Sequence, residues 1–414
     1  MADKKPRKGS SSQIVLGQDI PAVHLARLIK TSEEYTRKLN AERIEWPDPD
    51  QVDFEGDGDS EVVLDYDVSP SGFLTNQLGV VNRAMQKAQG GKKKGGKKGS
   101  SGGGGGGGKP KLPNPQTVNA EVKKTYVGIP YAGMNGNLAI GEFNGEFLDA
   151  SKARYFRDAY VEMFSHYHVM FLEEVDSAGV MQIAADLNAA GHSYTGYCST
   201  ANTRSQAVGF LVHSRLKVLA VKEHAQIASV QGVPDLRPAY QLDLEDTVTG
   251  EKFSVVVLHL KSMRGGPAVT AAVRFKQLDI LWKILGPNFK GFVGGDMNFV
   301  LDDTTLKDGD PLKNNGYTLF MPNDHTGTQS WGTRIDGWFV KGMTRKVDLY
   351  QVRAFFKNPS VTRAFSDHAA LTCQVVFCEP QFQLQSGTAN PGCKGGLQAS
   401  DFPVDVVGAS GSTQ

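Results

Sequence analysis

The stretch GFVGGDMNF, residues 291–299, decides how the rest of the sequence is interpreted. It starts as a short apolar run, passes through a Gly-Gly pair and then presents Asp296 and Asn298. A short apolar run bounded by turn residues is typical of a buried strand. Because an ionisable group is costly to bury without a partner, a carboxylate at the end of such a strand is expected to be paired or functional. The stretch therefore predicts a buried strand that ends in chemically useful side chains.

Four further segments repeat this pattern of acids or histidines beside an apolar strand. They are FLEEVDS (171–177) with Glu173 and Glu174, VVVLHLKS (255–262) with His259, RIDGWFV (334–340) with Asp336, and FSDHAAL (365–371) with Asp367 and His368. Each segment alone is weak, since a strand-end Glu is more often a solvated cap, the histidine of HLKS could belong to the core, and GDMN also suits an Asx turn. All five together, each beside an apolar strand, indicate a functional site.

Helical patterns lie between these strands. The segment 149–167 opens with Asp149 and Ser151 and has apolar residues on one face, and the segment 269–285 is similar. Strands and helices alternate over residues 122–378, which predicts one α/β domain of roughly 255 residues, a size that a single core can support.

Composition divides the remainder of the chain into three regions. Residues 1–89 contain one amphipathic helix, predicted from Ile20 to about Arg43, and an acidic stretch from Glu45 to Asp67. Residues 90–121 form a Gly/Lys-rich linker, and residues 379–414 form a tail. The linker and the tail bury too little apolar surface to offset their ordering entropy, so we expect both to be flexible and partly disordered.

Charge and cysteine content exclude few functions. The chain has 45 Lys and Arg against 44 Asp and Glu, so its net charge of +1 neither favours nor excludes a polyanionic partner. No apolar run is long enough for a membrane span or a secretory signal. The four cysteines lack CxxC spacing, which argues against a zinc site. We expect a soluble cytoplasmic protein, with nuclear import through the Lys-rich tract as an alternative; the oligomeric state stays open.

The order LEEVD, HLKS, GDMN, RID, SDH resembles the endonuclease/exonuclease/phosphatase superfamily, whose fold is shared by DNase I-like and exonuclease III-like enzymes. The resemblance covers about residues 123–377. It implies a four-layer α/β/β/α sandwich with a metal-dependent phosphoester hydrolase site. One departure is Glu173, which stands where the family commonly has Gln.

The resemblance implies a divalent metal site formed by Asn135, Glu174 and Asp367, with Asn137 as the alternative to Asn135. Carboxylate and amide oxygens suit Mg²⁺, which keeps several waters and needs few carboxylates. We therefore expect Mg²⁺, with Mn²⁺ as a possible substitute.

The resemblance also implies roles for the catalytic residues. Asp296 would orient or deprotonate the attacking water, and Asn298 would donate to a phosphate oxygen. His368 would contact the phosphate, with Asp336 accepting from its other ring nitrogen and thereby raising its pKa.

His259 resembles the second histidine of the DNase I-like branch, a candidate general acid for the leaving oxygen. Gln206 stands near the place where that branch commonly has a Glu to orient this histidine. A neutral amide raises a histidine pKa less than a carboxylate does, so His259 is expected to act mainly by hydrogen bonding. Arg204, in the same loop, is a candidate substrate contact, and a solvated surface Arg is the competing interpretation.

These residues favour a Mg²⁺-dependent phosphodiesterase that hydrolyses nucleic acid, with a DNA endonuclease as the leading form. The run typical of inositol-polyphosphate phosphatases is not found. Two alternatives stay open: a phosphoesterase acting on phospholipid headgroups or small phosphorylated molecules, and a non-catalytic member of the fold.

Overall fold

The structure is a computed structural model that describes residues 22–41, 114–126, 138–200, 206–230, 232–321, 327–329, 332–343 and 365–375. The acidic stretch, most of the Gly/Lys-rich linker and the tail lie outside the described residues, as do Asn135, Asn137 and Arg204. The expectations placed on them remain predictions.

The first sheet has five strands in the order β11–β1–β2–β4–β3. Its central strands, β1 (Leu138–Leu148) and β2 (Val169–Val175), are parallel, and every other pairing in the sheet is antiparallel. The other members are β3 (Tyr194–Cys198), β4 (Ala207–His213) and β11 (Leu371–Val375).

The second sheet has six strands in the order β5–β6–β7–β8–β10–β9. It also contains one parallel pair, β7 (Lys252–His259) with β8 (Gly291–Asp296). The remaining strands are β5 (Leu216–His224), β6 (Ala239–Asp246), β9 (Thr318–Phe320) and β10 (Asp336–Lys341).

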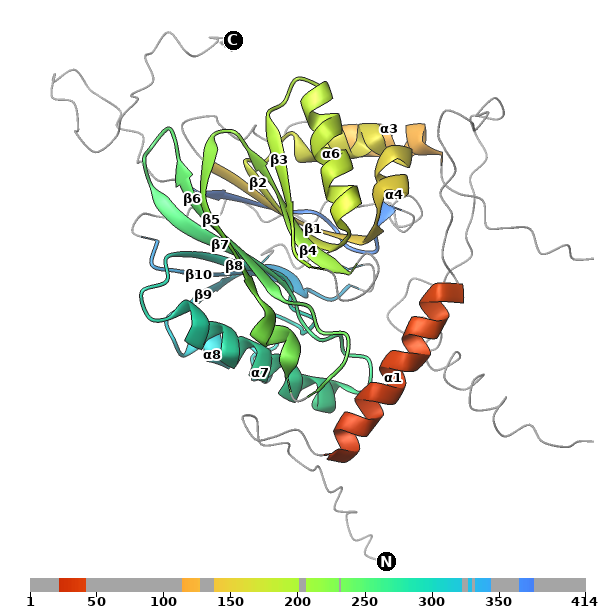
Figure 1. Ribbon diagram of the computed structural model, residues 1–414, viewed down its shortest axis with the longest axis vertical. Coiled ribbons are helices and arrows are strands. Elements are labelled where there is room, and N and C mark those ends of the chain that lie inside the picture. The colour runs from red at the N-terminus through yellow and green to blue at the C-terminus, as the bar shows by residue number, and fades with distance from the viewer. Residues whose placement is uncertain are drawn as a thin grey trace, which may run out of the picture.

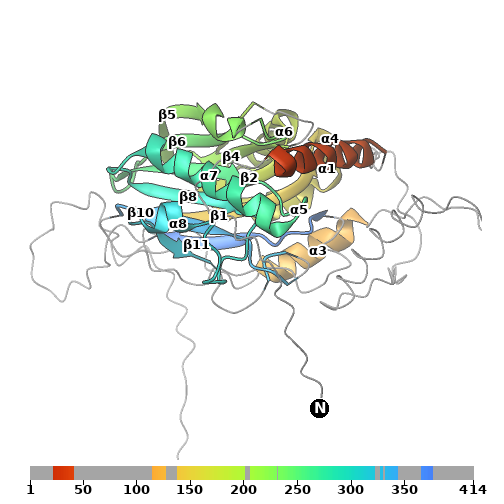
Figure 2. The ribbon, with the colours of Figure 1, turned by 90° about the horizontal axis from the view of Figure 1, so that it is seen from below.

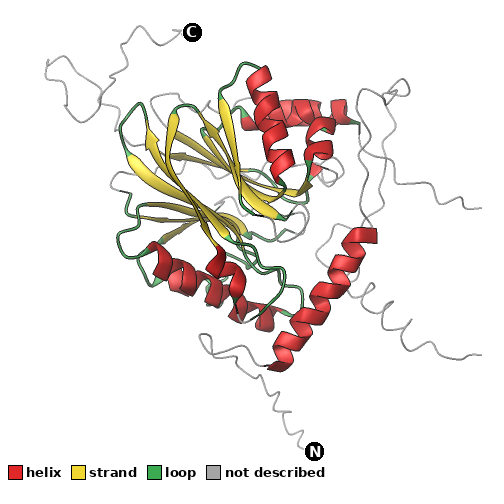
Figure 3. Ribbon diagram, in the orientation of Figure 1, coloured by secondary structure: helices red, strands yellow, loops and turns green. Residues whose placement is uncertain are grey.

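Helices cover the outer face of each sheet (Figures 1 and 3). The first sheet is covered by α3 (Pro115–Tyr126), α4 (Ala150–Tyr155), α5 (Arg157–Phe164) and α6 (Ser177–Ala189). The second is covered by α7 (Pro267–Leu285) and α8 (Asp310–Lys313), and a 3-10 helix, η3 (Ala225–Ser229), lies before β6. The order helix, sheet, sheet, helix confirms the predicted four-layer sandwich (Figure 2).

Alternation along the strands explains these layers. In β1, Leu138 and Ile140 point into the core between the sheets, whereas Ala139 and Phe143 point to the helices. Successive side chains of a strand lie on opposite faces, so a strand that is apolar at consecutive positions is buried on both. The same alternation carries polar residues at the ends of these strands to the edge between the two sheets.

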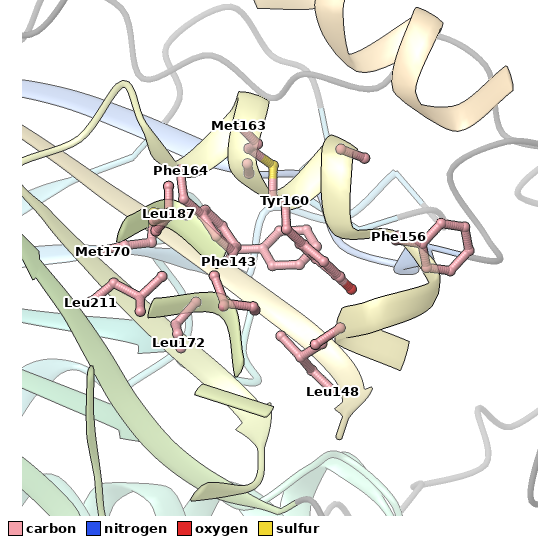
Figure 4. Close-up of a cluster of buried hydrophobic side chains, with 14 of the residues drawn as sticks. Phe143, Leu148, Phe156, Tyr160, Met163, Phe164, Met170, Leu172, Leu187 and Leu211 are labelled. Carbon is pink, nitrogen blue, oxygen red and sulfur yellow. The ribbon is translucent and has the colours of Figure 1, made fainter. Parts of the chain in front are cut away.

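An aromatic cluster beneath the helices anchors the segment that carries His368. Figure 4 shows Phe143, Tyr160 and Phe164 together under α5. The Phe365 ring stacks on that of Tyr160, with ring centroids 4.5 Å apart, and contacts the ring of Phe143 at 5.5 Å. Because Phe365 is fully buried, the chain that follows it has a fixed starting point.

Two boundaries differ from the predicted ones. The helix predicted over 149–167 is split into α4 and α5 at Phe156, whose backbone is not helical and whose ring is buried. Helix α3 begins at Pro115, so it spans the predicted domain boundary after residue 121, and Val118 and Val122 enter the core. Apolar spacing alone did not reveal either feature, because both depend on packing against distant residues.

The predicted N-terminal helix is present as α1 (Ala22–Ala41), drawn in red beside α7 in Figure 1. Leu28 is fully buried in a small cluster with residues of α7 and of the segment 230–236. The helix is therefore attached to the second sheet's side of the domain.

Candidate active site

The functional side chains gather at one edge, where the parallel strands of both sheets end. Glu174 lies at the end of β2, His259 at the end of β7 and Asp296 at the end of β8. Asp336 opens β10 directly opposite Asp296, since β10 runs antiparallel to β8. Strand directions thus bring together residues that are far apart in the sequence.

The Gly-Gly pair before Asp296 lets β8 approach its neighbours closely. A Cβ on Gly294 would collide with the Trp338 ring, and one on Gly295 with the Leu258 carbonyl oxygen. Gly295 also has a φ of 128°, which residues with a side chain rarely adopt. The glycines of the GFVGGD segment are therefore required to place Asp296.

His368 is held by Asp336. Its Nδ1 lies 2.9 Å and 3.0 Å from the two carboxylate oxygens of Asp336, and Thr328 donates its hydroxyl to the same carboxylate at 2.5 Å. Burial alone would lower the pKa of His368, but Asp336, Asp367 and Asp296 outweigh it and place the pKa well above its usual value. The ring is therefore a buried cation at neutral pH.

Asp296 lies between the two histidines. Its Oδ2 is 3.4 Å from His259 Nε2 and 3.8 Å from His368 Nε2. Burial and the neighbouring Asp336 raise the pKa of Asp296 to about 8, while His368 and the backbone N–H of Asn298 oppose the rise. Asn298 also donates its side-chain amide to the Leu260 carbonyl at 3.1 Å, so one of its two N–H groups is already used.

Glu174 reaches the site through a bulge in β2. The pairing of β2 with β4 shifts register between Glu173 and Val175, and Glu174 has a φ of 50°. Its Oε1 lies 3.9 Å from His259 Nε2. A bulge of this kind re-aims a side chain, which explains why both glutamates of the LEEVD segment do not point the same way.

Left-handed backbone is concentrated at this edge. Among described non-glycine residues, positive φ values occur at Glu146, Phe147, Glu174, Asp235 and Asn298. Such conformations cost of order 1–3 kcal/mol each and persist where surrounding structure enforces them, typically at functional sites. Four of the five lie beside the strand ends described above.

His259 is buried without the partner expected for it. Gln206 donates instead to Glu174 Oε2 at 3.1 Å, and His259 Nδ1 has no hydrogen-bond partner among the described residues. Burial, then the nearby Arg237, lowers the pKa of His259 well below its usual value. The ring is therefore neutral and lacks the charge that a general acid would carry.

Asn144 was missed by the sequence interpretation and lies inside the site. It sits on β1 next to Glu173 of β2, and its amide donates to Asp296 Oδ2 at 3.3 Å. The Ser366 hydroxyl donates to the Asn144 carbonyl at 2.6 Å and accepts from the His368 backbone N–H at 3.0 Å, which ties β1 to the SDH segment. The sequence signal that could have identified Asn144 is its place in an Asn-Gly pair directly after the apolar-rich run 138–143.

Three further carboxyl groups surround the edge. Glu142 and Glu173 are fully buried between the sheets, and none of their carboxyl oxygens has a hydrogen-bond partner among the described residues. Burial raises the pKa of both well above the usual value, and burial together with Asp367 raises the pKa of Glu146 to about 8. Lys152 holds the Glu146 turn by donating to the Gly145 and Glu146 carbonyls at 2.9 Å.

A comparison with protein families matches the model of the Endonuclease/Exonuclease/phosphatase family to residues 141–368. The chain belongs to this family. The match extends from the middle of β1 to His368 and thus includes every described residue of the site. Members of the family are hydrolases that act on phosphoesters.

Several solved structures are similar to the chain. Humanized D. rerio TDP2 has 18% sequence identity and a TM-score of 0.44, with 57% of this chain and 98% of that chain covered. The human Nocturnin catalytic domain has 17% identity and a TM-score of 0.44, with 58% and 94% covered. An endonuclease/exonuclease/phosphatase from Bacteroides vulgatus has 14% identity and a TM-score of 0.45, with 58% and 99% covered. A comparison with curated proteins found no match.

The site residues fit the divalent metal that the family generally uses. Asp296, Asp336 and His368 are buried with side-chain donor atoms within 4.8 Å of one another. The carboxylates of this group could face a metal, whereas the charged His368 ring has no free lone pair for one. Glu174 and Asp336 each raise the pKa of Asp296, so the carboxylates repel one another and a divalent cation would offset that repulsion. Carboxylate oxygens are the donors that hard cations such as Mg²⁺ and Mn²⁺ take.

No helix in the described part of the chain is long and apolar enough to cross a membrane.

Proposed function

We propose that the chain is a divalent-metal-dependent phosphodiesterase that hydrolyses nucleic acid, most readily as a DNA endonuclease. The observation that carries the proposal is the buried Asp336–His368 pair beside Asp296 at the strand ends. A ring that is charged at neutral pH and lies next to a carboxylate suits attack of water on a phosphate, which needs a proton acceptor and stabilisation of new negative charge.

Asp296 is the proposed acceptor. It would orient the attacking water and take its proton in its ionised form, which His368 and the backbone N–H of Asn298 favour. Asn298 and Asn144 hold the Asp296 carboxylate by donating from the backbone N–H at 2.9 Å and from the side-chain amide at 3.3 Å.

The two histidines are proposed to contact the phosphate differently. His368, kept charged by Asp336, would donate from Nε2 to a phosphate oxygen and offset the charge that develops there. His259, neutral, would donate a hydrogen bond without a full charge. This agrees with the expectation that His259 acts mainly by hydrogen bonding.

Glu174, Asp367 and Asn144 are the proposed holders of the metal. Asp367 Oδ1 lies 3.7 Å from His368 Nε2, so it faces the same space as Glu174 and Asp296. We place Asn144 in the role predicted for Asn135, because Asn144 bonds to Asp296. When bound, Mg²⁺ or Mn²⁺ would supply Lewis-acid stabilisation of the phosphate oxygens.

Plasmid nicking tests the proposal. The full-length protein should nick supercoiled plasmid DNA with Mg²⁺ and lose that activity in EDTA. Asp296→Ala should lower the rate by at least about 10²-fold, because it removes the proposed proton acceptor. His192→Ala, on the loop between α6 and β3, is the matched control and should keep the wild-type rate.

Two results would contradict the proposal. Nicking that persists in Asp296→Ala would exclude Asp296 as the acceptor. Release of phosphate from small phosphorylated molecules without any nicking would favour the small-molecule phosphoesterase instead.

A further inference from the structure

The segment that follows His259 is fixed on one side to the catalytic edge, which is the edge where strands β2, β7 and β8 end, and on the other side to α7. The Leu260 backbone N–H donates to the Asp296 carbonyl at 3.0 Å, and the Lys261 backbone N–H donates to Gln277 Oε1 at 3.0 Å. Arg274 donates to the Lys261 carbonyl at 3.1 Å. The Lys261 side chain therefore leaves a rigid point of backbone next to the site.

Lys261 is a buried cation that forms no ion pair with any acid in the described part of the chain. Its exposed fraction is 7%, and its ammonium makes no ion pair or hydrogen bond within the described residues. Arg274, equally buried on the adjacent helix, differs because its guanidinium pairs with Asp308 at 2.6 Å. An unpaired buried charge is costly, and an anion bound beside it would offset that cost.

Two arginines add to the charge at this place. Burial and then Arg237 lower the pKa of Lys261 to about 8, with Arg264 and Arg274 acting in the same direction and Asp235 against it. Arg237 and Arg264 also lower the pKa of His259, so their positive charges act on both Lys261 and that histidine. Asp235 acts against these cations, and its effect on the pKa of Lys261 is smaller than that of Arg237.

Helix α1 closes the outer side of the same segment. Leu28 lies against Gly265, and the Arg27 guanidinium lies near Gly266. Gly265 and Gly266 have φ values of 105° and 112°, so the turn requires glycine where α1 contacts it. Helix α1 thus contacts the turn that follows Arg264, and the Arg264 side chain itself is exposed.

We propose that Lys261, together with Arg237 and Arg264, forms an anion subsite beside His259 that holds a second phosphate of the substrate, the one next to the phosphate under attack. The occupant is a nucleic-acid strand, which presents phosphates on both sides of the bond that is cut. The inference rests on the proposed function, and it adds that the enzyme selects substrates with more than one phosphate.

The test compares two substrates and one substitution in the full-length protein. The substrates are bis(p-nitrophenyl) phosphate, which has a single phosphate, and a single-stranded oligothymidylate. In Lys261→Met, which keeps the length of the buried stem, the ratio of kcat/KM for oligothymidylate to kcat/KM for the small diester should fall at least about tenfold. Lys283→Met, at the other end of α7 where Lys283 pairs with Asp279, is the control and should leave the ratio unchanged.

Binding gives a second readout that does not depend on turnover. With EDTA present, the slope of log affinity for oligothymidylate against log salt should decrease by about 0.7 in Lys261→Met, the value for one phosphate contact with a single strand. Arg264→Gln, a change of an exposed side chain, should act in the same direction. If thermal melting shows that Lys261→Met does not fold, the salt slope of Arg264→Gln provides the measurement.

The outcomes separate the subsite from the proposed function. The subsite would be overturned if the wild type hydrolyses both substrates and if Lys261→Met and Arg264→Gln each keep the wild-type kcat/KM ratio and the wild-type salt slope. The proposed function would then remain intact. A wild type that hydrolyses neither substrate, but whose salt slope decreases on substitution, would overturn the proposed function and support the subsite.

Discussion

A buried histidine lies at each end of the parallel pair β1–β2, and one of the two rings is neutral whereas the other is positively charged. At the amino end, His168 accepts a hydrogen bond from the Ala139 backbone N–H at 3.0 Å, and burial, then Arg215, lowers its pKa to about 3. At the carboxyl end, His368 lies against Asp336 and its pKa is raised well above the usual value. Both rings are more than nine-tenths buried.

The comparison shows that burial leaves a histidine of this fold neutral unless neighbouring carboxylates outweigh it. Burial, then Arg215 and His213, favours the neutral form of His168, and the ring serves as a hydrogen-bond acceptor for the sheet. His368 has three carboxylates nearby, so its charged form is favoured despite burial. Only the end where strand-terminal acids gather can stabilise developing negative charge.

Replacement of each histidine by alanine is the strongest way to break this comparison. We expect His368→Ala to lower turnover on plasmid DNA at least about 10²-fold, because it removes a buried charge that contacts the phosphate. His168→Ala should melt at a lower temperature but keep turnover within a few fold of wild type, since His168 lies at the opposite end of the strands. Steady-state rates and thermal melting curves of the two purified variants provide the measurement.

Equal losses of turnover in both variants would contradict the comparison. They would show that the fold as a whole, rather than the carboxyl end, is sensitive to removal of a buried ring.

Much of the carboxyl end could be predicted from the sequence, because its residues stand directly beside apolar strands. Asp296, Asp336 and His368 were placed at strand ends by this rule, and the structure brings them within 4.8 Å of one another. The alternation of strands and helices predicted an α/β domain, and the four-layer arrangement followed from the resemblance to the endonuclease/exonuclease/phosphatase superfamily.

Asn144 could not be placed in the same way. It lies inside an eleven-residue strand that is buried on both faces. The sequence alone did not indicate that the strand continues as far as Asn144. The sequence analysis placed the metal-orienting Asn at Asn135, with Asn137 as the alternative, and both lie outside the described residues, so that prediction stays untested. Only the pairing of β1 with β2, and the bond from Asn144 to Asp296, identifies the residue at the site.

The hydrogen-bond environment of His259 could not be predicted from the sequence either. Gln206 stands near the expected position, yet its amide donates to Glu174, because the bulge in β2 turns that carboxylate toward β4. A single-residue shift in register decides this partner, and register depends on the packing of both sheets.

A smaller change tests whether Asp336 sets the charge of His368. Asp336→Asn keeps the side-chain size but removes the negative charge, so the pKa of His368 should fall toward or below its usual value. The charged ring is present below its pKa and lost above it. We therefore expect turnover at alkaline pH to fall by at least about tenfold, and the alkaline limb of the pH–rate profile to move to lower pH.

Asp243→Asn provides the control for this profile. Asp243 pairs with Lys222 at 2.7 Å, away from the catalytic residues, so its neutralisation should leave the alkaline limb where it is. An alkaline limb that does not move in Asp336→Asn would show that His368 is not the group that titrates there.

The smallest expected effect concerns stability at the amino end. Because the pKa of His168 is about 3 in the folded protein and near 6.5 when unfolded, the unfolded state binds more protons between these values. Stability from the neutral ring is thus fully present above about pH 6.5 and is lost as the pH falls toward 3. His168→Asn keeps an acceptor for the Ala139 N–H but does not titrate, so it escapes this loss.

The free energy of unfolding of the wild type relative to the variant should decrease by about 1–3 kcal/mol between pH 7 and pH 4, measured by urea denaturation. A difference that stays constant with pH would mean that His168 is not held neutral, and the contrast between the two ends of the strand pair would then rest on His368 alone.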